Sequence, residues 1–234
     1  MKSYGDDVMV KGKPIIGILA TSNYLLTNDT FQDTYRYGNN YAKKIVECGG
    51  IPYFIPLVDE NIVPDTLEVC DGLLLPGGNR VRPVCFEIID YFYNSNKPIL
   101  GICLGMQTLA MYSTRSEDRR VLKLIDNGVD HHPVELVRDN NDTVVHKDYV
   151  KKDSKLFDII KDEEIMVNSV HKSTITDVGK NFRVSITSED GLIEGLEYIG
   201  DDKFIIGVQF HPEILPQFNN IFDVFINKCK KDTK

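Results

Sequence analysis

One cysteine lies between two glycines at the junction of an apolar run and a segment of helix-forming residues. The pentapeptide 101–105, Gly-Ile-Cys-Leu-Gly, follows the run 97–100 and precedes the segment 106–111. This strand–turn–helix order is the context of a nucleophile elbow, in which glycines allow the sharp turn. The turn exposes the Cys103 thiol at a strand end and a helix N-terminus, where the helix dipole favours the thiolate. The motif therefore predicts a reactive thiol at the edge of a sheet.

Apolar runs alternate with helical patterns through the first half of the chain. The expected strands are 14–20, 51–56, 71–76 and 99–102, and the expected helices are 35–48, 61–69 and 84–93. This alternation is typical of a parallel sheet that helices cover on both faces.

Beyond about residue 130 the pattern changes to short segments that are rich in β-formers. These are 134–137, 143–146, 164–167, 182–187, 192–198 and 204–210, and a closing helix is expected over 218–228. We predict a single α/β domain over residues 13–234, with a mostly parallel central sheet, flanking helices and a β-rich second half. Residues 1–12 are expected to be a disordered extension.

The composition limits the classes of partner. The 234 residues carry a net charge of −8, which gives no reason to expect nucleic acid or an anionic membrane as a partner. The N-terminal segment includes Asp6 and Asp7 and lacks the apolar stretch of a signal peptide. The five cysteines contain no C-x-x-C pair, which favours free thiols in a reducing compartment. We therefore expect a cytoplasmic protein that acts on a small molecule.

A cysteine nucleophile needs a base, and the base needs an orienting group. His211 follows the apolar segment 204–210, and Glu213 lies two residues later, within reach of the second imidazole nitrogen. Taken alone, this His-Pro-Glu sequence also fits an ordinary turn. The N–H of Leu104, next to the cysteine, is a candidate oxyanion donor, and the glycine-rich turn 77–79 could supply a second donor or serve only as a turn.

The remaining cysteines and histidines suggest no second site. Cys48 and Cys70 are expected in the core, and Cys229 is expected in an exposed, lysine-rich tail. The histidines at 131, 132 and 146 match no common zinc spacing, so we predict no metal and no cofactor.

Seven stretches resemble class I glutamine amidotransferases, and more closely their γ-glutamyl-γ-aminobutyrate hydrolase-like branch, peptidase C26. They are 13–18, 49–52, 71–78, 101–107, 167–171, 190–194 and 207–213. They keep the family order and extend over nearly the whole chain from residue 13. The resemblance implies the flavodoxin-like architecture of class I amidotransferases.

The same resemblance implies a role for each matching residue. Cys103 is then the nucleophile, His211 the general base and acid, and Glu213 the group that orients His211. The remaining implied residues are Gly78 and Leu104 for the oxyanion hole, and Gln107, Asn168, Ser169 and His171 for the γ-glutamyl substrate.

The implied reaction is cleavage of a γ-glutamyl amide through a thioester, with release of glutamate. The alternative is a glutaminase subunit that delivers ammonia to a separate synthase. The segments 14–18 and 168–171 resemble the hydrolase branch, whereas Leu104, where that branch often has arginine, resembles the amidotransferases. A homodimer is compatible with either interpretation, and a non-catalytic γ-glutamyl-binding protein is a third one.

The leaving amine is not defined by the motifs, because the loop 112–120 departs from the family pattern. Arg80, Arg82 and Arg115 lie near loops expected to flank the leaving group. They could bind a carboxylate there or be solvated surface charges.

Overall fold

The computed structural model describes residues 12–20, 22–25, 33–58, 61–115, 121–125, 129–133 and 143–230. The extension predicted at 1–12, apart from its last residue, lies outside the described residues, as do the strand predicted at 134–137 and most of the divergent loop 112–120.

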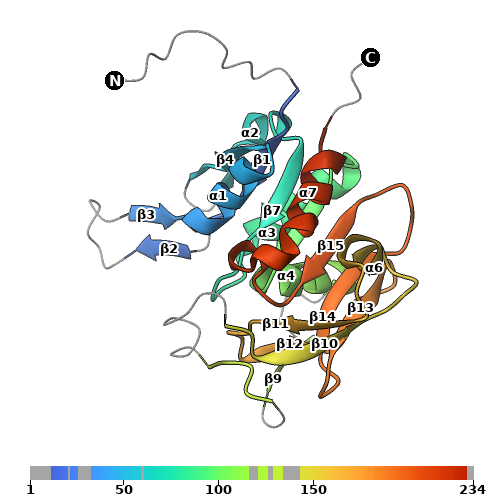
Figure 1. Ribbon diagram of the computed structural model, residues 1–234. Helices are drawn as coiled ribbons and strands as arrows, with labels where there is room; N and C mark the ends of the chain where they lie inside the picture. The colour runs from blue at the N-terminus through green and yellow to red at the C-terminus, as the bar shows by residue number, and fades with distance from the viewer. Residues whose placement is uncertain are drawn as a thin grey trace, which may run out of the picture.

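A nine-stranded mixed sheet forms the centre of the molecule (Figure 1). Its order is β11-β10-β13-β14-β15-β8-β7-β1-β4. The parallel half comprises β15 (Ile205–Val208), β8 (Ile99–Ile102), β7 (Gly72–Leu75), β1 (Ile15–Ile18) and β4 (Ile51–Phe54). The antiparallel half comprises β11 (Glu164–Val167), β10 (His146–Val150), β13 (Phe182–Ser188) and β14 (Ile193–Tyr198). The antiparallel pair of β14 and β15 joins the two halves. The β-rich second half of the chain thus extends the parallel sheet on one side.

The burial of the side chains differs between the parallel and the antiparallel strands. Every residue of β7, β8 and β15 is buried, which is the pattern of strands covered on both faces. In β10 and β11 buried and less buried residues alternate, because only one face of these strands packs on the core.

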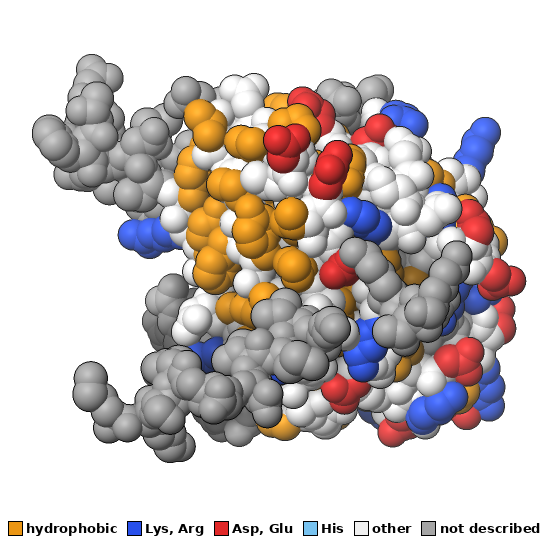
Figure 2. Space-filling model, turned by 90° about the horizontal axis from the view of Figure 1, so that it is seen from above, with side chains coloured by type: hydrophobic (Ala, Val, Ile, Leu, Met, Phe, Trp, Pro, Cys, Tyr) orange, Lys and Arg blue, Asp and Glu red, His pale blue; other side chains and the backbone are white. Residues whose placement is uncertain are grey.

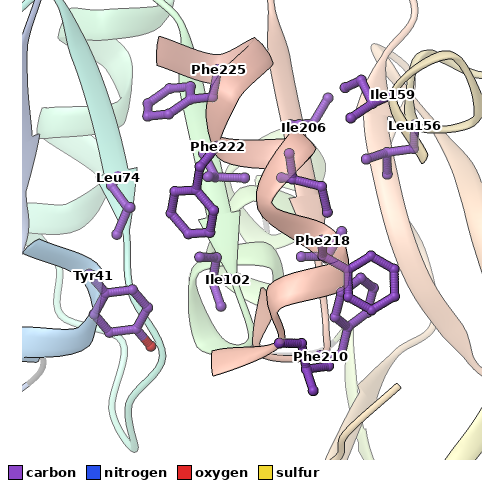
Figure 3. Packing of buried hydrophobic residues seen from close by; sticks show 14 of the residues in the cluster. Tyr41, Leu74, Ile102, Leu156, Ile159, Ile206, Phe210, Phe218, Phe222 and Phe225 are labelled. Atoms are coloured by element: carbon purple, nitrogen blue, oxygen red, sulfur yellow. The ribbon is translucent and has the colours of Figure 1, made fainter. Parts of the chain in front are cut away.

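Helices cover both faces of the parallel half. One face carries α1 (Asn39–Glu47) and α7 (Asn219–Lys228), and the other carries α3 (Val84–Asn94) and α4 (Leu104–Thr114). Figure 3 shows Phe222 of α7 beside Leu74 and Ile102 in the first of these two apolar layers. The alternation of side chains along β7 places the neighbouring Leu73 and Leu75 in the other layer.

The smaller elements complete the connections. Three two-stranded sheets pair β2 (Ser22–Leu25) with β3 (Asp33–Arg36), β5 (Leu57–Val58) with β6 (Asn61–Ile62), and β9 (Leu122–Leu124) with β12 (Ser173–Ile175). The short helices are α2 (Pro64–Glu68), α6 (Lys155–Ile160), η2 (Pro212–Ile214) and η3 (Pro216–Phe218).

Some predicted boundaries were wrong. The helix predicted at 35–48 begins at Asn39, because the preceding residues pair as β3. The helix predicted at 61–69 is divided into β6 and α2, with Pro64 at the first helical position, where its fixed φ is favourable. The strand predicted at 143–146 begins only at His146.

The cysteines are all free thiols, as the sequence predicts. Cys70 is buried and Cys48 is partly buried. The prediction for Cys229 was wrong: this residue caps α7 and is buried among apolar side chains of the core.

No described helix has the length and apolar character needed to cross a membrane. Figure 2 shows one face of the surface, on which apolar side chains gather on one side while lysines and arginines are dispersed among acidic groups. Among the described residues visible on this face there is no concentrated basic patch.

Candidate active site

Cys103 occupies a strained turn between β8 and α4. Its backbone has φ 53° and ψ −108°, in the left-handed half of conformational space that non-glycine residues rarely adopt. Two hydrogen bonds hold this turn: the Cys103 N–H donates to the Val208 carbonyl at 2.8 Å, and its carbonyl accepts from the Gln107 N–H at 3.1 Å. The predicted elbow is therefore present, with the cysteine at the N-terminus of α4.

His211 and Glu213 lie at the same edge of the sheet as the elbow. The parallel register of β15 and β8 pairs Val208 with Ile102, so both strands end side by side. The Nδ1 atom of His211 is 2.8 Å from Oε1 of Glu213. Its Nε2 atom is buried and has no hydrogen-bond partner among the described residues. One nitrogen is thus held by the carboxylate while the other remains available for proton transfer.

The imidazole of His211 interacts with the Cys103 thiol as well as with Glu213. Burial by itself lowers the pKa of His211, but the Glu213 carboxylate and Cys103 outweigh it and hold the pKa well above its ordinary value. A histidine with a raised pKa favours the imidazolium form, which in turn stabilises a neighbouring thiolate. Such an arrangement can activate a thiol as a nucleophile.

Asn168 holds the backbone of His211. It follows β11, and its Oδ1 accepts the His211 N–H at 2.8 Å while its Nδ2 donates to the His211 carbonyl at 3.1 Å. The sequence resemblance implied a substrate contact for Asn168. In the structure each end of the amide bonds the His211 backbone and Asn168 is buried, which favours a positioning role.

Replacing Asn168 with alanine leaves the His211 N–H and carbonyl unpaired. We expect kcat to fall by about 10- to 100-fold, which corresponds to roughly 1–3 kcal/mol, and KM to change little. Asn168→Asp retains the acceptor for the His211 N–H but sets a charged acceptor against the His211 carbonyl, so its effect is expected to be at least as large. A raised KM with unchanged kcat would instead favour the substrate contact.

Tyr41 is a site residue that the sequence motifs missed. Its hydroxyl accepts the N–H of Gly77 at 3.0 Å. Burial, together with the nearby Glu213 carboxylate, raises the pKa of Tyr41 and keeps its hydroxyl neutral. Tyr41 thus occupies the N–H of Gly77, whereas Gly78, the next residue in this loop, lines the cavity beside Cys103. Tyr41 lies within a helix of unremarkable sequence, and no local pattern marks it.

A cavity of about 290 Å³ opens beside Cys103. Five of the predicted site residues line it: Cys103 itself, Gly78, Leu104, Gln107 and His171. Asn168 and Ser169 are not among the described residues that line it. The Ser169 side chain is fully buried, and its hydroxyl donates to the His131 carbonyl at 2.8 Å, so its expected substrate contact is not found.

Gln107 presents a defined polar atom to this cavity. Its Nε2 donates to the Ser173 carbonyl at 2.9 Å and to Oε1 of Gln209 at 3.0 Å. Both amide hydrogens are therefore used, and the atom that Gln107 can offer a ligand is its carbonyl oxygen. A carbonyl acceptor suits an ammonium group.

Two of the three arginines considered for the leaving group are directed elsewhere. Arg115 caps the C-terminal end of α4, roughly 16 Å along the helix from its start at the elbow. Arg82 is buried and donates to the Ala20 carbonyl at 2.8 Å. Arg80 is exposed, close in sequence to the loop at Gly78, and remains a candidate.

The structure also brings three histidines and a glutamate together next to the cavity, and one of them, His171, lines it. They are His131, His146, His171 and Glu194, each offering one ligand atom within 4.8 Å of the others. The sequence predicted no metal, because the spacing of the histidines at 131, 132 and 146 matches no common zinc site. Burial lowers the pKa of His171 to about 4, so this imidazole is neutral at physiological pH.

A family model described as peptidase C26 matches residues 14–88 and 84–213 of the chain. The chain belongs to the peptidase C26 family. A Schizosaccharomyces pombe protein whose name proposes a glutamine amidotransferase is 31% identical over 223 residues, covering 83% of this chain and 84% of the relative. One subunit of a glutamine-hydrolysing GMP synthase from Methanosphaera stadtmanae is 27% identical and covers 74% of this chain and 86% of the relative.

A solved structure shares the fold. The glutaminase domain of a Trypanosoma brucei CTPS, with bound acivicin, superposes with a TM-score of 0.65 at 18% identity and covers 93% of this chain and 94% of that one. The predicted α/β architecture of class I amidotransferases is confirmed. This peptidase C26 protein is accordingly a glutamine amidotransferase-like hydrolase.

Proposed function

We propose that this peptidase C26 protein cleaves γ-glutamyl amide bonds, such as that of γ-glutamyl-γ-aminobutyrate, with Cys103 as the nucleophile. One observation carries the proposal: the strained Cys103 turn, the His211–Glu213 pair and the cavity lined by Gln107 meet at one sheet edge. A thiolate beside an oriented imidazole at a helix N-terminus is suited to acyl transfer.

The first half of the reaction forms a thioester. The Cys103 thiolate attacks the γ-carbonyl carbon, and the carbonyl oxygen takes the negative charge. The backbone N–H of Leu104, at the first turn of α4, and that of Gly78 are the donors for this oxyanion. His211 then gives its proton to the nitrogen of the leaving amine, and the carbon–nitrogen bond breaks.

The second half releases glutamate. Neutral His211 accepts a proton from water as the water attacks the thioester carbonyl. The second tetrahedral intermediate collapses, the carbon–sulfur bond breaks, and the Cys103 thiolate is restored beside the imidazolium. The Glu213 carboxylate stabilises the charged imidazole at Nδ1 throughout.

The polar groups of the cavity suit the amino-acid end of a γ-glutamyl group. The Gln107 carbonyl oxygen can accept from the α-ammonium. Lys172 lines the same cavity and supplies a positive charge for the α-carboxylate. The amine side of the substrate has no comparable set of described partners, so the proposal extends to other γ-glutamyl amines and peptides.

A glutaminase subunit that supplies ammonia to a synthase is the second candidate. Leu104 favours it, because this position follows the nucleophile and resembles the amidotransferases rather than the hydrolases. The similarity to a GMP synthase subunit supports the same interpretation. The two candidates share the thioester chemistry and differ in whether the chain works alone.

The deciding experiment measures glutamate release by the purified chain from γ-glutamyl-γ-aminobutyrate, a γ-glutamyl dipeptide and glutamine. We expect release from a γ-glutamyl amine, and its loss in Cys103→Ala. Cys48→Ala is the matched control, because burial raises the pKa of the Cys48 thiol to about 12 and this residue caps α1 away from the cavity.

Two outcomes would change the conclusion. Undiminished release by Cys103→Ala would exclude Cys103 as the nucleophile. No release from any substrate, together with covalent labelling of Cys103 by a glutamine-like electrophile, would favour the synthase-dependent subunit.

A further inference from the structure

Three imidazoles and one carboxylate converge in the second half of the chain. His131 comes from the segment 129–133, His146 from the start of β10, His171 from the connection between β11 and β12, and Glu194 from β14. Their ligand atoms lie within 4.8 Å of one another. All four residues are 5% exposed or less, so the cluster is closed to solvent.

Two of the histidines have a carboxylate beside one of the two ring nitrogens. The Nε2 atom of His131 is 3.2 Å from Oδ2 of Asp190. The Nδ1 atom of His146 is 2.9 Å from Oδ1 of Asp148. In metal sites a ligating histidine nearly always directs its second nitrogen to a carboxylate or a backbone carbonyl in this way.

The third histidine follows the same rule with a backbone partner. The Nδ1 atom of His171 is 3.1 Å from the Ser173 carbonyl, which requires a hydrogen on Nδ1 and leaves a lone pair on Nε2. That Nε2 atom is 3.4 Å from Oε1 of Glu194, and Nδ1 of His131 is 3.9 Å from the same oxygen. In all three rings the nitrogen opposite the outer partner is therefore the one left for the centre of the cluster.

The inner atoms lack hydrogen-bond partners. Among the described residues, the Nε2 atoms of His146 and His171 and both carboxylate oxygens of Glu194 have none. The Nδ1 atom of His146 and the Asp148 carboxylate also lack a hydrogen bond of good geometry, so their 2.9 Å contact is an ion-pair contact. The Ser169 hydroxyl lies 3.4 Å from Nδ1 of His131 but already donates to the His131 carbonyl. Buried polar atoms are almost always paired, so acceptors that face one another call for a cation between them.

The geometry points to a closed, tetrahedral zinc site formed by His131, His146, His171 and Glu194. Imidazole nitrogen and carboxylate oxygen are ligands that Zn²⁺ prefers, and ligand bonds of about 2.0–2.1 Å separate neighbouring ligand atoms by roughly 3.3 Å. The distances of 3.4 and 3.9 Å to Glu194 therefore need only a small contraction. One carboxylate among three imidazoles is a poor set for Mg²⁺ or Ca²⁺.

Four protein ligands leave no open position, so the ion is structural rather than catalytic. It joins four segments that are distant in the sequence. One of its ligands, His171, lines the cavity beside Cys103. The ion thus holds the wall of the active-site cavity without contact with the scissile bond.

The test uses the full-length chain, purified without a metal-affinity step and analysed for bound metal by mass spectrometry. We expect one equivalent of zinc per chain, or one equivalent taken up when Zn²⁺ is added after chelation. We expect this equivalent to be lost in His146→Gln and in Glu194→Gln. Cys103→Ala and His132→Gln are the controls, and both should retain the zinc. The first removes the thiol that lines the cavity and the second removes an imidazole that lines it, but neither changes a ligand of the cluster.

Titration with Co²⁺ tests the ligand set without any substitution in the cluster. We expect the visible bands of a tetrahedral Co²⁺ complex, no thiolate charge-transfer band, and a raised Tm. Three results would overturn the proposal: uptake of no stoichiometric metal, uptake that is lost in Cys103→Ala, or a thiolate band in the cobalt spectrum. The wild-type spectrum decides the matter even if the cluster variants fail to fold.

Discussion

Replacing Glu213 with glutamine is expected to lower kcat/KM for γ-glutamyl amide cleavage by about three to four orders of magnitude. The substitution preserves the shape of the side chain and removes its charge. Oε1 of Glu213 is 2.8 Å from Nδ1 of His211, and the carboxylate both selects the tautomer and stabilises the imidazolium. A neutral amide does neither, so the thiolate–imidazolium pair loses its main support.

The same variant should change how stability depends on pH. The pKa of His211 is raised in the folded protein, where burial lowers it but Glu213 and Cys103 raise it more. When the pKa of a histidine is higher in the folded than in the unfolded protein, protonation stabilises the fold. This stabilisation is complete at pH values below the pKa in the unfolded chain, about 6.5, and is lost as the pH rises through the pKa in the folded protein. We therefore expect Glu213→Gln to reduce the free energy of unfolding more at about pH 6 than at about pH 9.

Urea unfolding at the two pH values and steady-state kinetics would measure these effects. Glu163→Gln is a suitable control, because it removes an exposed carboxylate whose ion pair with Lys152 lies at the surface. Activity within tenfold of wild type in Glu213→Gln would show that the orientation of His211 does not depend on this carboxylate.

The turn at Cys103 and the placement of His211 and Glu213 beside it could be predicted because each follows directly from a local pattern. Cys103 and His211 each follow an apolar strand within a few residues, and parallel strands that end together bring such residues to one edge. The strands β8 and β11 were predicted with correct bounds, since each is a short segment with a clear pattern: β8 is apolar and buried throughout, and in β11 buried and exposed residues alternate.

The remaining features of the site depend on contacts between distant segments. Tyr41 reaches Gly77 only because α1 packs against the sheet edge, and Asn168 reaches His211 across the end of β11. The histidine–glutamate cluster is the clearest example. Spacing rules for metal sites describe ligands on one or two adjacent segments, whereas these ligands come from four. No local sequence pattern predicts how the strands of the antiparallel half and their connections bring these four segments together.

Replacing Gly105 with alanine is expected to prevent folding or to lower the free energy of unfolding by roughly 3–5 kcal/mol, beyond the usual cost of overpacking. A Cβ at this position would lie 2.1 Å from the Leu75 carbonyl oxygen and 2.7 Å from its carbonyl carbon. Both atoms belong to the backbone of the central strand β7, so no side chain can rotate to relieve the clash. The gain of about 1 kcal/mol that alanine normally brings to a helix is too small to compensate.

Gly49→Ala is the matched control for this prediction. Gly49 has φ +86°, but no atom lies within 4 Å of the position that an added methyl group would take, so its substitution should cost only about 1–2 kcal/mol of conformational strain. Thermal and urea unfolding of the two variants separate the effect of backbone crowding from that of backbone conformation. If Gly105→Ala were as stable as Gly49→Ala, α4 could move away from β7, and the position of Cys103 would not depend on their close contact. If it is far less stable, the strained turn at Cys103 is held in place by the contact between α4 and β7, which only a glycine at position 105 allows.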